Sequence, residues 1–340
     1  MRIAFYLKMA TTNLHRINEI DIMKGIAILC VMIGHTCWIP CIRTFIYSFH
    51  IPLFFLVSGY FAKTYHTDND DFKGFVSRNA KQLLIPYLVL ACFSALYALV
   101  LSFMQGDFRI LVRDMIRYFI AMDKTWENTL FDQWVTPAWF LPALFWARLF
   151  FWELSRTGKW FLPLCAVLSI SMILIHPYVP TPLCIGRGVE ALVFMALGRA
   201  YRQYQCPLWI KVVAIGCWIG SMFLGRIDMC GFCFHCIPID IVGSCGGTLF
   251  VLLLAKGINR THGKPFFAWC GKNSLLILCA HTMLYDINIL HCAIKKLPFR
   301  IPETMYYDCK HLVTLCAAWI YSFAKNHLCS RFSGNAIGEK

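Results

Sequence analysis

The stretch Asp21-Ile22-Met23-Lys24-Gly25-Ile26-Ala27-Ile28-Leu29-Cys30-Val31-Met32-Ile33-Gly34-His35 is apolar enough for a membrane helix, yet it carries an acid, a base and a histidine. Along an α-helix each residue advances by about 100° and 1.5 Å, so Lys24 and His35 share one face about 16 Å apart, with Asp21 close to it. An ionisable side chain that faces lipid costs at least about 2.5–3.5 kcal/mol. The pattern therefore predicts that this face borders a protein interior or a wet cavity, although an interfacial lysine and a histidine bonded to a backbone carbonyl would explain each residue singly.

The rest of the 340-residue chain is also apolar, with 59% hydrophobic and only 15% charged residues. Its apolar runs are too long and too many for one water-soluble core, and they are typical of a polytopic helical membrane protein. The net charge of +14 would suggest nucleic acid as the partner of a soluble protein. Here the Lys and Arg residues are scattered between apolar runs, as membrane-flanking anchors are, so no nucleic-acid partner is expected.

The predicted fold class is all-α, a polytopic integral membrane protein with about ten transmembrane helices. The expected spans are approximately 19–38, 44–63, 83–104, 135–153, 160–176, 185–203, 208–225, 237–257, 265–286 and 311–326. Lys and Arg are more numerous in the segments on the side of the amino terminus, so both termini are predicted to be cytoplasmic. The expected organisation is a cytoplasmic segment over 1–18, a membrane domain over 19–326 and a cytoplasmic tail over 327–340.

Two connecting segments carry patterns of their own. Arg109, Arg113 and Arg117 recur every four residues between apolar residues, which predicts an amphipathic helix at the membrane interface. The segment Cys230–Cys236 contains three cysteines and a histidine, a spacing that could bind zinc or form a disulfide. Because a clear second pair of ligands is lacking, no metal site is predicted there.

The predicted orientation sorts the polar residues within the spans into two layers. The inner layer is cationic and contains Lys24, Arg148 and Lys272. The outer layer contains histidines and acids, namely His35, His50, His281, Glu190 and Asp240, together with Arg187. Lysine and arginine bind phosphate strongly, and imidazole can accept a proton from a hydroxyl. Each residue alone could snorkel to headgroups or bond to a neighbouring helix, but the layered set favours a reaction path through the membrane.

Four sequence blocks carry a resemblance to a known family. They are Ile20–His35, Phe49-His50-Ile51-Pro52-Leu53-Phe54-Phe55-Leu56-Val57-Ser58-Gly59-Tyr60-Phe61, Ala138-Trp139-Phe140-Leu141 and Ser274–His281. Over nearly its whole length the chain resembles the membrane acyltransferase-3 family, and most of all its fucose 4-O-acetylase-like branch of sugar O-acetyltransferases. The resemblance implies a multi-pass enzyme of the bacterial plasma membrane. It would transfer an acyl group, usually acetyl, from acetyl-CoA to a hydroxyl of an envelope polysaccharide or a lipid-linked glycan precursor.

The resemblance also implies partners and roles. The expected partners are the lipid bilayer, acyl-CoA as co-substrate and a glycan acceptor, and no bound cofactor is expected. Lys24 and His35 correspond to a functional basic residue and histidine, although many members carry arginine in place of the lysine. The full set of expected site residues is His35, His281 and His50 for catalysis, Lys24, Asp21, Arg148 and Lys272 for the donor, and Trp139, Glu190 and Asp240 for the acceptor.

In the mechanism that we expect, His35 is the general base, and His281 or His50 orients the acceptor or stabilises the oxyanion. A covalent acyl-enzyme intermediate stays open as an alternative. Charged residues within membrane helices also mark transport pathways, so a transporter or flippase of an acyl or lipid-linked sugar species is the second reading. The sequence shows no repeated halves, which many transporters have. The third interpretation is a structural subunit of an envelope complex.

Overall fold

The computed structural model describes residues 2–37, 39–62, 71–121, 137–176, 178–179, 181–204, 206–231, 233–287 and 312–323. Within these ranges all regular elements are helical, and an isolated antiparallel bridge pairs Asp228 with Cys233. The all-α class is therefore confirmed. The α-helices are α1 Arg2–Thr36, α2 Pro40–Tyr47, α3 His50–Phe61, α4 Phe72–Asn79, α5 Ile85–Gln105, α6 Arg109–Ile120, α7 Phe140–Leu154, α8 Phe161–Ile175, α9 Ile185–Glu190, α10 Leu192–Gln203, α11 Leu208–Leu224, α12 Ile237–Ile258, α13 Lys264–Lys272 and α14 Ser274–Ile287.

Four helical stretches in the described part of the chain are long and apolar enough to cross a membrane. They are Pro40–Phe61, Phe72–Gln105, Pro137–Ile175 and Ile237–Ile258. Shorter apolar helices cover Leu208–Leu224, Ser274–Met283 and Leu312–Phe323. The chain is thus an apolar helical protein suited to a bilayer, while ten spans and two cytoplasmic termini stay predictions.

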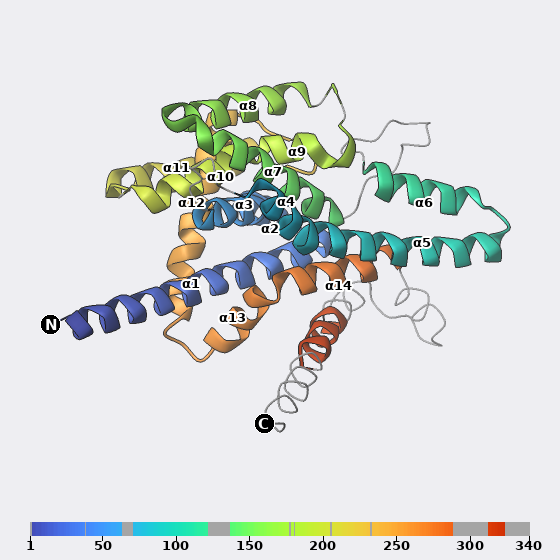
Figure 1. The fold of residues 1–340 in the computed structure, drawn as a ribbon, viewed down its shortest axis with the longest axis horizontal. Coiled ribbons are helices and arrows are strands. Elements are labelled where there is room, and N and C mark those ends of the chain that lie inside the picture. Colours follow the sequence, from blue (N-terminus) through green and yellow to red (C-terminus); the bar gives the residue numbers. More distant parts are fainter. Residues whose placement is uncertain are drawn as a thin grey trace.

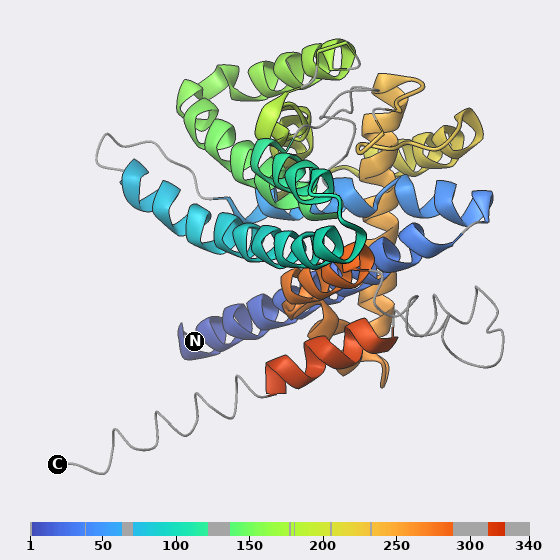
Figure 2. The same ribbon diagram turned by 90° about the vertical axis from the view of Figure 1, so that its right-hand side faces the viewer.

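Five helices, α2, α3, α12, α13 and α14, pack against α1. Figure 1 shows α1 in blue crossing the molecule, and α13 and α14 in orange contact it. Figures 1 and 2 both place α8 above α1 and the helix Leu312–Phe323 below it. Other contacting pairs are α3 with α10, α11 with α12, and α7 with α9. This arrangement places α1, α3, α7 and α14 around the centre of the molecule.

The span expected at 185–203 is divided into α9 and α10, a difference from the prediction. The hydroxyl of Ser169, on α8, donates to the carbonyl oxygen of Val189 at 2.9 Å and accepts from the backbone N–H of Val193 at 2.9 Å. The inserted hydroxyl satisfies the backbone groups that an uninterrupted helix would pair with each other. Insertion of a side chain into the hydrogen-bond ladder is a known cause of helix kinks.

The span expected at 265–286 is also divided, here into α13 and α14. The side-chain amide of Asn273 donates to the carbonyl oxygen of Trp269 at 2.9 Å, and its backbone leaves the helical region with φ −101° and ψ 17°. Asparagine competes for backbone hydrogen bonds in this way, so it ends the helix. Lys272 consequently lies at the carboxyl end of α13 instead of within a long span.

The stretch between Pro137 and Ile175 bends between α7 and α8, where two separate spans are expected. Gly158 lies in the 3₁₀ segment Ser155–Trp160 and has φ +60° and ψ −120°, a conformation that side chains disfavour.

The amphipathic helix expected around Arg109, Arg113 and Arg117 is present as α6. This helix packs on α5. Arg117 pairs with Asp114 of the same helix at 2.8 Å and donates to the hydroxyl of Ser94, on α5, at 3.1 Å.

Close contact between α1 and α13 fixes the position of the charged part of α1. A Cβ added at Gly271 would overlap the carbonyl oxygen of Asp21, and one added at Gly25 would overlap the carbonyl oxygen of Phe267. Small residues allow two helix backbones to approach this closely within a membrane domain. The crossing therefore lies immediately beside Lys24.

Candidate functional site

A cavity of about 720 Å³ opens at the centre of the helices. Its walls come from α1, α3, α4, α7 and α14, with contributions from the π-helical turn Ala80–Leu84 and the 3₁₀ turn Pro137–Trp139. Lys24, Ile28, Val31 and His35 all line it. The face of the first helix that carries the base and the histidine thus borders one continuous space, as the helical period predicts.

Three cationic side chains line the cavity, together with the acidic Asp71. The ammonium nitrogen of Lys24 lies 3.0 Å from Oδ1 of Asp21, three residues earlier on α1. Arg78, on α4, and Arg148, on α7, also line the cavity. Of the expected donor residues, Lys24 and Arg148 line the cavity and Asp21 is paired with Lys24, whereas Lys272 is exposed and lies outside the lining.

Arg148 joins three elements of the cavity wall. Its Nε donates to the hydroxyl of Ser58 on α3 at 3.0 Å, and its Nη1 donates to Oδ1 of Asn79 and Oε1 of Gln82, each at 3.1 Å. Asn79 immediately precedes the π-helical turn and Gln82 lies within it, and such turns are common at functional sites. The hydrogen bonds fix a guanidinium at the cavity wall, where its charge can meet an anion. The sequence did not predict Arg78, Asn79 or Gln82 as site residues, because an arginine before a span is typical of a membrane anchor and the two amides belong to no motif.

Two histidines meet at the other end of the cavity. The ring of His281, on α14, is fully buried, and its centroid lies 5.5 Å from that of His35 with an interplanar angle of 38°. His50 lies elsewhere, since it is buried outside the cavity lining and its Nδ1 lies 2.8 Å from the carbonyl oxygen of Ile46. Of the three expected catalytic histidines, the structure therefore brings two together.

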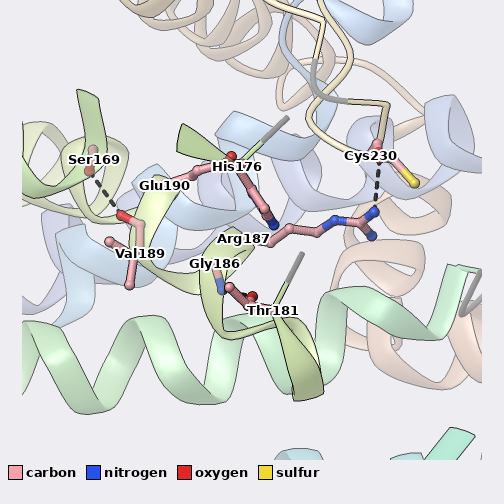
Figure 3. Close-up of polar contacts among 8 residues, drawn as sticks. All are labelled: Ser169, His176, Thr181, Gly186, Arg187, Val189, Glu190 and Cys230. Atoms are coloured by element: carbon pink, nitrogen blue, oxygen red, sulfur yellow. Dashed lines mark hydrogen bonds and ion pairs between the residues drawn. The ribbon is translucent and has the colours of Figure 1, made fainter. Parts of the chain in front are cut away.

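Trp139 lines the cavity, and a buried arginine supports its ring from outside the lining. The guanidinium carbon of Arg187 lies 4.7 Å from the Trp139 ring centroid, and its Nη2 donates to the carbonyl oxygen of Cys230 at 2.9 Å (Figure 3). Burial raises the pKa of the Cys230 thiol, and the Arg187 guanidinium opposes part of that rise. The thiol therefore stays protonated at neutral pH. Cys230 holds Arg187 in place through its backbone carbonyl group, not through its thiol.

Glu190 belongs to a buried hydrogen-bonded pair instead of the cavity lining. Its Oε1 lies 2.6 Å from Nδ1 of His176, and both side chains are almost fully buried (Figure 3). His176 is not among the predicted site residues, because its only signal in the sequence is its position at the end of an expected span. Such a pair fixes α9 against the end of α8, so an acceptor-binding role for Glu190 stays a prediction.

Asp240 also lies away from the cavity lining, at the start of α12. Its Oδ2 accepts the backbone N–H groups of His235 and Cys236 at 2.7 and 3.0 Å. A carboxylate at a helix amino terminus is stabilised by these donors and by the helix dipole. An acceptor-binding role for Asp240 also stays a prediction. The neighbouring Cys230, Cys233 and Cys236 are free thiols, and the described residues contain no cluster of three or more potential metal ligands.

Comparison with known proteins places this site in a family. Residues 17–325 match the acyltransferase-3 family model, described as an acyltransferase domain. No curated protein and no solved structure matches the chain significantly. The match covers most of the chain, including every residue of the cavity. The chain therefore belongs to the acyltransferase-3 family of membrane acyltransferases.

Proposed function

We propose that this protein is a membrane-bound O-acyltransferase that moves an acetyl group from acetyl-CoA to a hydroxyl of an envelope polysaccharide or a lipid-linked glycan precursor. The observation that carries the proposal is the single cavity lined by Lys24 at one end and His35 at the other. One end offers cations for a phosphate-bearing donor, and the other offers imidazoles for proton transfer. The enzyme would act in the bacterial plasma membrane, as a member of the sugar O-acetyltransferase branch.

The donor is expected to enter from the cationic end. Lys24, Arg78 and Arg148 line the cavity and would bind the phosphates of CoA. Asp21 fixes the direction of the Lys24 side chain through its ion pair. The thioester would then extend along the apolar part of the cavity toward His35, past residues such as Ile28 and Val31.

The acyl transfer is expected at the histidine end. The acceptor hydroxyl oxygen bonds to the thioester carbonyl carbon while its proton passes to a ring nitrogen of His35. The carbon–sulfur bond then breaks, and the CoA thiolate takes the proton back from His35. The ring of His281 packs against His35 and orients it. Trp139 would stack on the acceptor, since a flat aromatic face at a cavity wall suits a sugar ring.

A transfer assay tests the proposal directly. The purified protein in liposomes is given acetyl-CoA with a radiolabelled acetyl group and an envelope glycan extract from a strain that lacks this protein. We expect the label to become covalently attached to the glycan fraction. Label that enters the liposomes without any covalent attachment would favour a transporter and refute the acyltransferase.

Replacement of Lys24 by alanine is expected to weaken donor binding. The change removes one of the cations that would bind CoA phosphates, so KM for acetyl-CoA should rise by about tenfold or more, with a smaller change in kcat. Lys24→Arg keeps the charge and should retain most of the affinity. Steady-state kinetics of the two variants check this. An unchanged KM in Lys24→Ala would remove Lys24 from the donor site.

A further inference from the structure

Charged side chains gather around Tyr47, at the end of α2 and outside the cavity lining. The guanidinium carbons of Arg43 and Arg226 lie 5.5 and 5.1 Å from the centroid of the Tyr47 ring. Arg226 comes from the segment between α11 and α12, so the two arginines meet from distant parts of the chain. Asp228 pairs with Arg226 at 3.3 Å between Oδ2 and Nη2. We refer to Arg43, Tyr47, Arg226 and Asp228 as the Tyr47 cluster.

The Tyr47 cluster has an excess of positive charge, because two guanidinium groups face one carboxylate. Asp228 is occupied on both oxygens, since its Oδ1 also accepts the backbone N–H groups of Cys230 and Gly231 at 2.9 and 3.0 Å. It therefore fixes Arg226 to a rigid turn. The Nε of Arg43 is buried and lacks a hydrogen-bond partner among the described residues. The Arg226 side chain is 35% exposed, so a ligand can reach the cluster.

The Tyr47 cluster is attached to the catalytic end of the cavity through α1. A Cβ added at Gly34 would lie 3.1 Å from Cε2 of Tyr47, so this ring packs directly on the α1 backbone. The next residue is His35, which lines the cavity. The ring of His50 lies 4.9 Å from that of Tyr47 between centroids, so the buried histidine supports the tyrosine from behind.

A second connection runs through the turn that holds Arg226. The carbonyl oxygen of Cys230, in the same turn, accepts the hydrogen bond from Arg187 (Figure 3). The guanidinium of Arg187 in turn lies over the ring of Trp139. One short segment thus contacts both the Tyr47 cluster and the support of the cavity wall. A ligand held by the Tyr47 cluster would lie beside the cavity end that contains His35.

We propose that the Tyr47 cluster binds an anionic group of the glycan acceptor, a phosphate or a carboxylate, and so brings the acceptor hydroxyl to His35. This inference rests on the proposed function and names the class of acceptor, an acidic or phosphate-linked glycan. The planar guanidinium group suits both anions because it donates paired hydrogen bonds. In the predicted topology α2 follows the outer end of the first span, which places the cluster opposite the Lys24 end.

A lipid headgroup of the bilayer fits the Tyr47 cluster less well than an acceptor. Cations that anchor a helix to headgroups spread along its face, as the exposed Arg109 and Arg113 do on α6. The two arginines of the Tyr47 cluster instead converge on one ring, and one of them is fixed by a carboxylate in a turn. Convergence from separate segments is the geometry of a binding site for one group.

Equilibrium binding to the full-length protein in phosphatidylcholine nanodiscs tests the inference. The probes are radiolabelled farnesyl phosphate, as a short lipid-linked phosphate, and radiolabelled glucuronate, as an acidic sugar. We expect Arg43→Gln and Arg226→Gln each to weaken binding of one probe by about tenfold or more, and Arg226→Lys to lose less. The matched control is Arg113→Gln, which removes an exposed arginine from α6 and should leave the Kd unchanged. Thermal unfolding verifies that each variant is folded.

The outcomes separate the sources of the anion. Displacement of farnesyl phosphate by inorganic phosphate but not by farnesol assigns a phosphate-linked acceptor. Tighter binding of glucuronate than of farnesyl phosphate assigns an acidic sugar. Equal Kd values for wild type and both arginine variants, an equal loss in Arg113→Gln, or displacement of both probes by phosphatidylglycerol in the nanodisc would overturn the inference. Binding needs no acyl transfer, so a protein that binds through these arginines but transfers no acetyl would refute only the proposed function.

Discussion

Replacement of His35 by alanine is expected to lower the rate of acetyl transfer by about 10²–10⁴-fold, the usual contribution of a well-placed general base. The donor-binding end of the cavity is built from other side chains, so KM for acetyl-CoA should stay near its wild-type value. His35 is only half-buried at the cavity wall, and the change leaves space instead of a clash, so the helices should stay packed. Single-turnover kinetics of the purified variant measure the effect on the chemical step.

Two controls separate a missing base from a damaged fold. His262→Ala removes an exposed histidine from the turn between α12 and α13, outside the cavity lining, and should leave transfer unchanged. Imidazole added to His35→Ala can occupy the space that the side chain leaves, and it should restore part of the rate. Transfer at the wild-type rate by His35→Ala without imidazole would exclude His35 from the mechanism.

The helical period made the central feature of the site predictable. Lys24 and His35 share a face in any regular helix over this stretch, and the cost of exposing them to lipid required that this face be covered. The contact between His35 and His281 was harder to foresee, because nothing local links two helices so far apart in the chain. Only the expected layering placed both rings at a similar depth.

The rest of the site depends on contacts that one sequence does not specify. Arg148 contacts Asn79 and Gln82 because α7 packs against the π-helical turn, and no local sequence pattern predicts such a turn. Two expected spans are divided by single polar residues, Ser169 and Asn273. Each of these polar residues is compatible with an unbroken apolar segment until its tertiary or local hydrogen bond is known.

Replacement of Gly271 by alanine is expected to be among the most destabilising single changes in this protein. The added methyl group would overlap the carbonyl oxygen of Asp21, a backbone atom that cannot move without displacing α1. Overpacking typically costs about 1–3 kcal/mol, and a clash with backbone belongs at the upper end of that range. Because the crossing lies beside Lys24, a displaced α1 should also raise KM for acetyl-CoA. Thermal unfolding in detergent and donor kinetics measure the two effects.

Gly216→Ala is the matched control for this crossing, because a Cβ at Gly216, on α11, would have no atom within 4 Å. The helix propensity of alanine should leave that variant as stable as wild type, or more stable by at most about 1 kcal/mol. Gly25→Ala opens the same crossing from the other helix, so its cost and that of Gly271→Ala should not add. Once one methyl group has forced the helices apart, the second meets less resistance. Similar unfolding temperatures for Gly271→Ala and Gly216→Ala would show that α1 and α13 do not pack backbone to backbone.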